Sequence, residues 1–233
     1  MTSGGLDGPE CAMAVHVASS SSQAYNYDRS VVMVSAPNAL SLKETAVLSG
    51  APEKSIRHEL AARVVHASRS GGRRLFSPRE VVYFFLLKEL PPGLGLDRKL
   101  RKDLFDLLAA DKERAGRWRR EARRLVLEGD VPVVLATEAL VKRVEERIRM
   151  FLRGRSRVTS SPEVLSGEPV FEGTRISVRS VGERARKGEP VAALLEDYPT
   201  LAAEDIEFAR MFTALGRPPG RPRKKLKFVR GDG

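Results

Sequence analysis

Cysteine, histidine and long apolar runs are scarce in this chain of 233 residues. The single cysteine, Cys11, cannot form an internal disulfide, and with the three histidines (His16, His58 and His66) it does not supply a zinc cluster. The longest apolar run, Val81–Leu87, is far shorter than the ~20 residues that cross a bilayer. The N-terminus also lacks the basic and then apolar order of a secretory signal. We therefore expect a cytoplasmic protein that makes no membrane contact.

Catalytic patterns are missing as well. The sequence has no Ser-His-Asp or Cys-His set and no phosphate-binding loop. Its carboxylates fall in charged helical segments, where solvation explains them. The sequence therefore predicts a binding protein and not an enzyme, with no cofactor, no metal site and no catalytic residue.

Positive charge is plentiful and unevenly spread, with a formal net charge of +11. Residues 37–90 hold nine basic and five acidic side chains, whereas residues 157–216 hold seven basic and ten acidic ones. The last seventeen residues hold seven basic and one acidic. This balance predicts a polyanion or an acidic protein as partner. Because the sign of the charge alternates along the chain, we expect more than one binding task.

The stretch from Ala39 to Leu90 is the most informative part of the sequence. Ser41 and Glu44 form a capping box that begins a short helix, and Gly50 ends this helix at a sharp turn. Pro52 then fits the first turn of a second helix. A helix, a short turn and a second helix are the layout of a helix-turn-helix. The outward side chains of the second helix can reach phosphates and base edges.

A basic hairpin is expected after the second helix. The segment Arg69-Ser-Gly-Gly-Arg-Arg-Leu-Phe is typical of a glycine turn, and its three arginines suit a wing that lies against a sugar-phosphate backbone. Ser77 and Glu80 form a second capping box, which opens a helix over Glu80–Leu90. The residues that we predict to bind DNA are Lys54, Ser55, Arg57, His58, Arg63, Arg69, Arg73 and Arg74.

In this order the segment resembles the winged helix-turn-helix of MerR-type transcriptional regulators. Their pattern has a short helix, a turn before a recognition helix, a basic wing ending in Arg-Leu-Phe/Tyr-Ser, and a capped helix. Here the wing ends in Arg74-Leu-Phe-Ser. The resemblance implies that residues 37–90 bind double-stranded operator DNA. The alternative is a small helical domain with a solvated basic face.

The residues from 91 to 156 are interpreted as a helical linker or dimerisation region. After Pro91-Pro-Gly, Asp97 caps a helix that we expect to continue to about Glu128, with leucines at helical spacing that pack or dimerise. Trp118 is expected to be a packing anchor. The alternative for this segment is that its arginines grip DNA; they are Arg117, Arg119, Arg120, Arg123 and Arg124.

A turn and a strand are expected over residues 129–136. A helix then follows from Thr137 to about Leu152, with an apolar stripe that is either core or a dimer seam. This strand and helix are expected to join the two ends of the protein.

Residues 157–216 contain a second set of motifs. Gly167 and Gly173 bracket a short strand, Pro169-Val-Phe, and Thr174-Arg-Ile-Ser-Val alternates like another strand. From the residues alone, this is a small hairpin with a three-helix bundle of helix-turn-helix type. The helices are expected over Ser180–Lys187, Pro190–Asp197 and Ala202–Leu215.

This segment also resembles a known family. The motif Gly167-x-Pro-Val-x-x-Gly-Thr-Arg-Ile, with Gly188-Glu, Glu196-Asp-Tyr-Pro-x-Leu and a later Glu-Asp-Ile, is similar to that of a small domain of unknown function carried by VapB-type antitoxins. The resemblance implies a type II toxin–antitoxin system, in which the antitoxin pairs with a PIN-type (VapC-like) ribonuclease toxin and represses its own operon.

The usual short form of that family has this domain alone, so the MerR-like unit in front is a departure. Residues 157–216 are net negative, which makes them the poorer DNA binder. We therefore assign DNA binding to residues 37–90, and dimerisation or toxin docking to residues 157–216.

The tail, residues 217–233, cannot build a core because of its prolines, glycines and like charges. One hypothesis is that it blocks the carboxylate-rich site of a PIN-type nuclease, each charged contact being worth about 1.5–3 kcal/mol. A rival is that Gly220-Arg-Pro-Arg-Lys resembles an AT-hook for narrow A·T minor grooves, and a third is a solubilising tail. The predicted toxin-binding residues are Arg217, Arg221, Arg223, Lys224, Lys225, Lys227, Phe228 and Arg230.

The predicted fold is mainly α with short β hairpins. A flexible arm (1–36), which holds a short strand at Val31–Val34, precedes the winged helix-turn-helix (37–90). A helical linker (91–156), a three-helix domain (157–216) and a disordered basic tail (217–233) follow. We expect an antitoxin that acts as a homodimer within a hetero-oligomer; the alternative is a stand-alone MerR-like regulator with an AT-hook-like tail.

Overall fold

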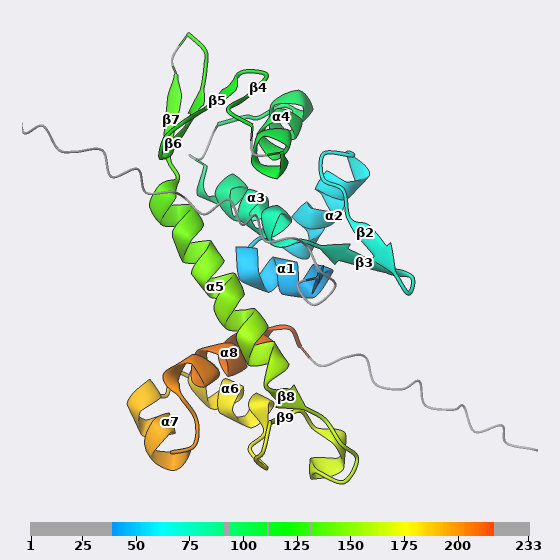
Figure 1. Cartoon of the computed structure of the whole chain (residues 1–233), viewed down its shortest axis with the longest axis vertical. Helices are drawn as coiled ribbons and strands as arrows, with labels where there is room; N and C mark the ends of the chain where they lie inside the picture. Colours follow the sequence, from blue (N-terminus) through cyan, green and yellow to red (C-terminus); the bar gives the residue numbers. More distant parts are fainter. Residues whose placement is uncertain (1–38, 91–93, 111, 131, 217–233) are drawn as a thin grey trace, which may run out of the picture. The chain divides into compact units, whose positions relative to one another are not determined.

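The computed structural model describes residues 39–90, 94–110, 112–130 and 132–216 (Figure 1). This part is mainly helical and holds small antiparallel sheets, which confirms the predicted fold class at that level. The predicted arm 1–36 with its valine strand, and the tail 217–233 with all its predicted toxin-binding residues, lie outside the described residues.

Two short helices open the described chain, as the capping pattern predicts. Strand β1 (Leu40–Ser41) leads into α1 (Leu42–Ser49), and α2 (Glu53–Ala61) follows after a turn. The Ser41 N–H donates to the Glu44 carboxylate (2.7 Å) while the Ser41 hydroxyl accepts from the Glu44 N–H, so the capping box is closed. Gly50 takes a left-handed φ of 70° where the chain turns.

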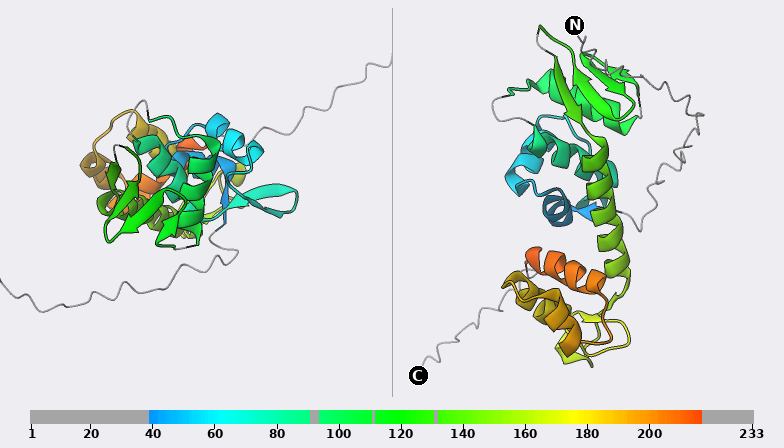
Figure 2. Two further views of the ribbon diagram at one scale, coloured as in Figure 1. Left: turned by 90° about the horizontal axis from the view of Figure 1, so that it is seen from above. Right: turned by 90° about the vertical axis from the view of Figure 1, so that its left-hand side faces the viewer.

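A hairpin and a third helix complete this unit. Strands β2 (Ser68–Ser70) and β3 (Arg73–Phe76) pair antiparallel, and β1 adds to the other side of β3. Figure 2 shows the hairpin projecting from the helices beside it. Helix α3 (Pro78–Glu89) begins at the second predicted capping box, where the Ser77 N–H donates to the Glu80 carboxylate (2.6 Å).

The prediction of one long helix over residues 97–128 is wrong. Helix α4 (Arg98–Ala109) ends near its midpoint, and the chain then forms an antiparallel sheet in the order β4-β5-β6-β7. Its strands are β4 (Arg114–Ala115), β5 (Trp118–Glu121), β6 (Arg124–Leu127) and β7 (Val133–Ala136).

The helix prediction failed because buried and exposed side chains alternate with a period of two residues in this segment, as in a strand. Trp118, Leu127 and Val133 stand in one row across the sheet, whereas Arg119 stands in the next row. Trp118 is fully buried and its indole N–H donates to the Leu100 carbonyl (2.9 Å), so the apolar rows cover α4. Arginine and glutamate favour helices. Here every second side chain is buried on one face of the sheet, and this burial outweighs the helix preference. Strand β7 confirms the strand predicted over 129–136.

Helix α5 (Glu138–Ser156) is the longest helix of the described chain. Its buried stripe of Val144, Ile148 and Phe151 packs on α3 and α8, so the stripe belongs to the core rather than to a dimer seam. Near its end, the Arg155 guanidinium donates to the Ala39 carbonyl (3.0 Å) and to the Glu44 carboxylate (3.2 Å).

The last unit contains a small sheet and three helices. Strands β8 (Val158–Thr159) and β9 (Val170–Phe171) flank a 3-10 turn, η2 (Leu165–Gly167). Helices α6 (Val178–Arg186), α7 (Val191–Asp197) and α8 (Ala203–Ala214) confirm the three predicted helices. The second strand predicted at Thr174 is wrong: β9 pairs with β8, and only one isolated bridge, Val170 to Ser177, lies on its other side. After the turn at Gly173, the Ile176 N–H donates to the Thr174 hydroxyl and α6 begins at Val178, so the segment does not continue as a strand.

Candidate nucleic-acid interface

The two faces of α2 differ in burial. Ile56 and Glu59 point inward and are 0% and 4% exposed. The four residues on the opposite face that were predicted to bind DNA are exposed, and so are the four predicted in the following loop and hairpin. These eight exposed residues are Lys54, Ser55, Arg57, His58, Arg63, Arg69, Arg73 and Arg74.

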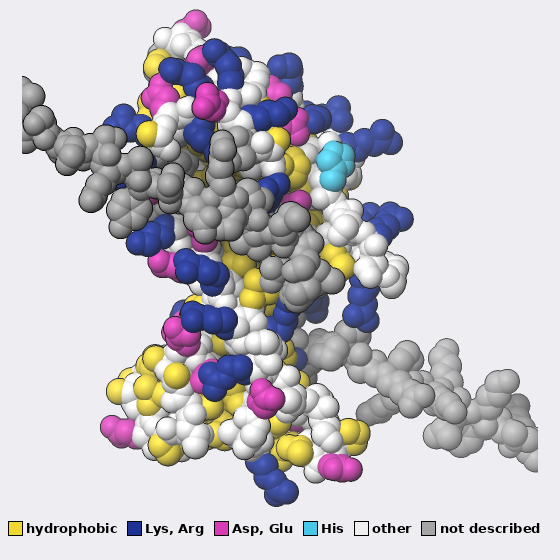
Figure 3. Space-filling model, viewed as in Figure 1, with side chains coloured by type: hydrophobic (Ala, Val, Ile, Leu, Met, Phe, Trp, Pro, Cys, Tyr) yellow, Lys and Arg dark blue, Asp and Glu magenta, His cyan; other side chains and the backbone are white. Residues whose placement is uncertain are grey.

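Most of these cations have no partner within the described part of the chain. Arg57 pairs with Glu53 on the same helix (3.0 Å), and this pair is exposed. The other five cations make no ion pair and no side-chain hydrogen bond with any residue that the structure describes; they are Lys54, Arg63, Arg69, Arg73 and Arg74. Figure 3 shows dark-blue side chains along the side of the molecule where α2 and the hairpin lie.

The hairpin places like charges opposite one another. Arg69 faces Arg74 across the two strands, and Ser70 faces Arg73. Directly opposed like charges destabilise a two-stranded ribbon, and an anion laid along the hairpin would remove that cost. The turn residues Gly71 and Gly72 both have positive φ, and an added Cβ on either would meet nothing within 4 Å, so the backbone tip is open to a ligand.

A buried polar network fixes α2 against the neighbouring helices. The Tyr83 hydroxyl of α3 donates to the Glu59 carboxylate (3.1 Å), which also pairs with Arg101 of α4 (3.1 Å). Burial, and then the Glu59 charge, raise the pKa of the Tyr83 phenol, so Tyr83 stays a donor. From α4, the Arg98 guanidinium donates to the Ala62 carbonyl at the end of α2 (2.7 Å). The outward face of α2 is therefore held in a fixed orientation.

The arginines of the β4–β7 sheet are a poorer candidate for DNA. Arg119 pairs with Glu121 (2.7 Å) and with Glu128 (3.3 Å), and Arg123 pairs with Glu138 (3.3 Å). Two more donate to backbone carbonyls, Arg117 to residue 128 and Arg120 to residue 107. Of the five arginines considered above as an alternative DNA-binding set, Arg124 alone has no ion pair or side-chain hydrogen bond with the described residues. Trp118 is buried and serves packing, as predicted.

The motif residues around Gly173 build turns rather than a ligand site. The Thr174 hydroxyl donates to the Phe171 carbonyl (2.9 Å) and accepts from the Ile176 N–H (3.0 Å). Gly167 and Gly173 have φ of 85° and 73°. Arg175 is exposed and has no partner among the described residues.

Ion pairs hold the rest of this motif together. Arg184 of α6 bonds to the carboxylates of Glu189 and Asp197, and to the Tyr198 hydroxyl (3.1 Å). The carboxylate of Asp205 is buried, caps α8 through the Ala202 N–H and pairs with Arg157 (2.7 Å). Hydrogen bonds to these acids raise the pKa of the Arg184 guanidinium. The motif therefore specifies the fold of residues 157–216.

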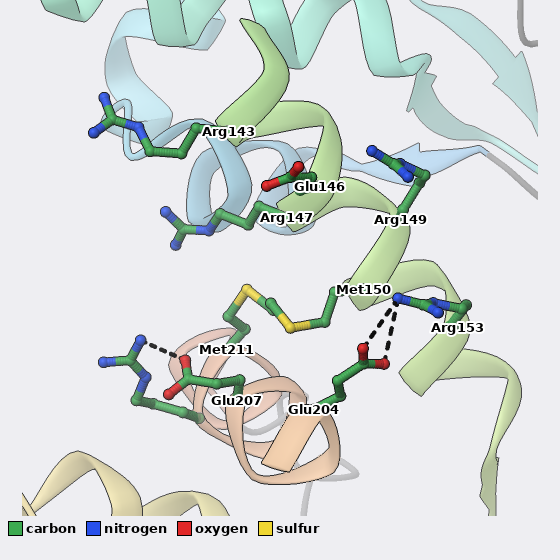
Figure 4. A pocket seen from close by; sticks show the side chains of 10 residues that line it. Arg143, Glu146, Arg147, Arg149, Met150, Arg153, Glu204, Glu207 and Met211 are labelled. Atoms are coloured by element: carbon green, nitrogen blue, oxygen red, sulfur yellow. Dashed lines mark hydrogen bonds and ion pairs between the residues drawn. The ribbon is translucent and has the colours of Figure 1, made fainter. Parts of the chain in front are cut away.

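A groove that no sequence pattern indicates lies between α5 and α8 (Figure 4). Its volume is about 520 Å³, and Met150 and Met211 lie among the arginines and glutamates that line it. Arg147 donates to the Val47 carbonyl (2.9 Å), and burial together with the Arg210 charge lowers its pKa. Arg153 and Arg210 are paired with Glu204 and Glu207. Because the residues come from helices far apart in the sequence, no local motif indicates this groove.

Among the described residues, no group of three or more His, Cys, Asp or Glu side chains could hold a metal ion. Within the same residues, each helix is either too short or too polar to span a membrane.

Comparisons with known proteins agree with the motif in the last unit. The family described as "Protein of unknown function (DUF433)" matches residues 158–212. The "Uncharacterized protein y4eO" of Sinorhizobium fredii (strain NBRC 101917 / NGR234) is 38% identical over 78 residues, which are 34% of this chain and 35% of that protein. The chain thus spans about a third of the length of this relative. No solved structure matches the chain. Residues 158–212 therefore carry a domain similar to the DUF433 family.

Proposed function

We propose that residues 40–89 are a winged helix-turn-helix that binds double-stranded DNA, with α2 in the major groove and the β2–β3 hairpin as the wing. One observation carries the proposal: five exposed cations on α2, on the loop after it and on the hairpin have no partner among the described residues. In the neighbouring sheet, by contrast, every described arginine except Arg124 bonds to a carboxylate or a backbone carbonyl. An unpaired cation is free to displace counterions from a phosphate. Arg57 would need to release only the exposed Glu53, a pair worth about 0.3–0.5 kcal/mol.

We propose further that the protein is an antitoxin that represses its own operon and neutralises a PIN-type ribonuclease. The support is the motif of residues 167–206, its similarity to the DUF433 family, and the excess of acidic residues there, which disfavours DNA. Since the described motif residues serve the fold, toxin contact is assigned to the basic segment 217–233, whose cations suit a carboxylate-lined site.

The proposed DNA binding is tested with a double-stranded DNA fragment from upstream of the gene. Its affinity for the protein is measured by fluorescence anisotropy over a range of salt concentrations. Replacing both Arg73 and Arg74 with alanine should reduce the slope of log K against log salt by about 1.8, because each lost phosphate contact contributes about 0.9. Replacing Arg119, an exposed but paired arginine, is the matched control and should leave the slope unchanged. Equal slopes for the two variants would refute the wing.

The antitoxin part is tested by co-expression with the product of a neighbouring gene that encodes a PIN-type nuclease. The two proteins should co-purify, and a chain ending at Gly216 should still bind DNA but release ribonuclease activity. If the full chains do not associate, the antitoxin proposal is wrong and a stand-alone regulator is favoured. If the shortened chain still silences the nuclease, the tail is not the inhibitor.

A further inference from the structure

The outer edge of β7 is an open sheet edge in the described part of the chain. In the sheet order β4-β5-β6-β7, no strand of the described residues pairs with its far side. Val134 is 51% exposed, and Pro132 and Ala136 are exposed as well. The strand Val133–Ala136 carries no charge and has no bulge in its pairing with β6. Native edge strands are usually guarded by charges, prolines, bulges, short length or a covering segment. Val133–Ala136 is short but has no charge, proline or bulge of its own, so its edge is open to docking.

The free edge presents a short and defined set of backbone groups. The Thr137 N–H donates to the Arg123 carbonyl (3.1 Å), in register with the pairing of Leu135 and Leu125. Successive residues of a strand point to opposite sides, so the N–H and C=O groups of Val134 and Ala136 point away from β6. Pro132 is the next residue along the chain that points the same way, and it has no N–H to donate.

We propose that β7 pairs antiparallel with β7 of a second copy, about a two-fold axis at Leu135. In this register Val134 faces Ala136 of the partner subunit, and Ala136 faces Val134 of the partner subunit. All four outward residues then exchange N–H···O bonds, which makes four main-chain hydrogen bonds. A register centred on Val134 would set Ala136 against Pro132 of the partner subunit and lose donors. The edge is thus self-complementary in one register.

The charges around the edge allow this pairing. Arg119 on the outer face is neutralised by Glu121 and Glu128, and Arg123 by Glu138. Arg124, which lies beside Ala136 in the sheet, would be three strand spacings from its own copy. That separation is about 14 Å, which exceeds the screening length of about 8 Å at physiological salt. On the outer face, each row across the join would hold Val126 and Val134 of one copy, followed by Ala136 and Arg124 of the partner subunit.

Four paired residues bury less than the roughly 1,200 Å² of a stable interface. The dimer is therefore weak by itself, and a second tether such as one DNA molecule would raise its occupancy. The inference goes beyond the proposed function and does not rest on it, because the edge and its register are properties of the sheet alone.

Cysteine crosslinking tests the register. In full-length chains that carry Cys11→Ser, one protein receives Val134→Cys and another Ala136→Cys. Under oxidation the mixture should form disulfide dimers, because directly opposed residues have Cα atoms about 5.5 Å apart, within disulfide range. Each protein alone should crosslink poorly, because its cysteines lie diagonally at about 7–8 Å. No crosslink in the mixture, or equal crosslinking by Val134→Cys alone, would overturn the proposal.

Sedimentation equilibrium of the full chain tests the association. Val134→Glu should weaken self-association at least about tenfold, because the carboxylate would be forced between Val126 of its own copy and Ala136 of the partner subunit. Leu165→Glu is the matched control, since Leu165 is the other large hydrophobic side chain that is 51% exposed in the described chain. It should leave the association unchanged. A wild-type chain that stays monomeric at all concentrations, or two variants with equal effects, would sink the inference.

Discussion

Replacing Glu59 with alanine tests how α2, the helix that we propose to bind DNA, is held against its neighbours. The Glu59 side chain is 5% exposed and bonds to both Tyr83 and Arg101. Breaking one partner of a buried pair costs about 3–5 kcal/mol because a charge is left uncompensated. Arg101 is 19% exposed and also donates to the Leu96 carbonyl (2.5 Å), so part of its charge stays solvated. We therefore expect a loss of about 3 kcal/mol in the free energy of unfolding.

The measurement is urea unfolding followed by circular dichroism. The control is Glu53→Ala on the same helix, where the carboxylate pairs with Arg57 and the two side chains are 38% and 63% exposed. An exposed pair of this kind is worth less than about 1 kcal/mol. Folded Glu59→Ala protein should also bind DNA more weakly, since α2 loses its link to α3 and α4. If both variants shift the unfolding midpoint equally, the network does not stabilise the protein.

Two further predictions concern packing and pH. Gly182→Ala should lower the free energy of unfolding by about 1–3 kcal/mol, because the added Cβ would overlap Thr213 and the Ala209 carbonyl where α6 crosses α8. Calorimetry should show this loss. The control Gly95→Ala should show none, because its Cβ meets nothing within 4 Å. Burial raises the pKa of Tyr83 above its ordinary value of 10.0. The contribution of the neutral Tyr83 side chain to the free energy of unfolding is therefore complete below pH 10 and is lost as the pH rises further. Unfolding measured on each side of pH 10 should show a flatter pH dependence for Tyr83→Phe, and equal slopes would contradict this assignment.

Local signals account for the parts of the fold that the sequence predicted. The two capping boxes, at Ser41 and Ser77, depend on residues three positions apart, and both occur as predicted. The Gly71-Gly72 turn and the three helices after Gly173 are local in the same sense.

Features that depend on distant residues were missed. The sheet of residues 114–136 needs α4 to cover Trp118, and its charged residues resemble a helix until that partner is known. The network at Glu59 joins three helices, and the groove between α5 and α8 joins helices far apart in the sequence. For the candidate interface, exposure of the cations was predictable, but their lack of partners was not. Which carboxylate reaches which arginine is a property of the folded chain.

The bonds of Arg155 have a consequence for synthesis. The arginine is 116 residues from Ala39 and 111 residues from Glu44, yet it bonds to both. During translation the first helix leaves the ribosome long before the arginine that braces its start. Early fragments would thus lack this brace, and the unit formed by residues 40–89 would be finished only after the middle of the chain had been made.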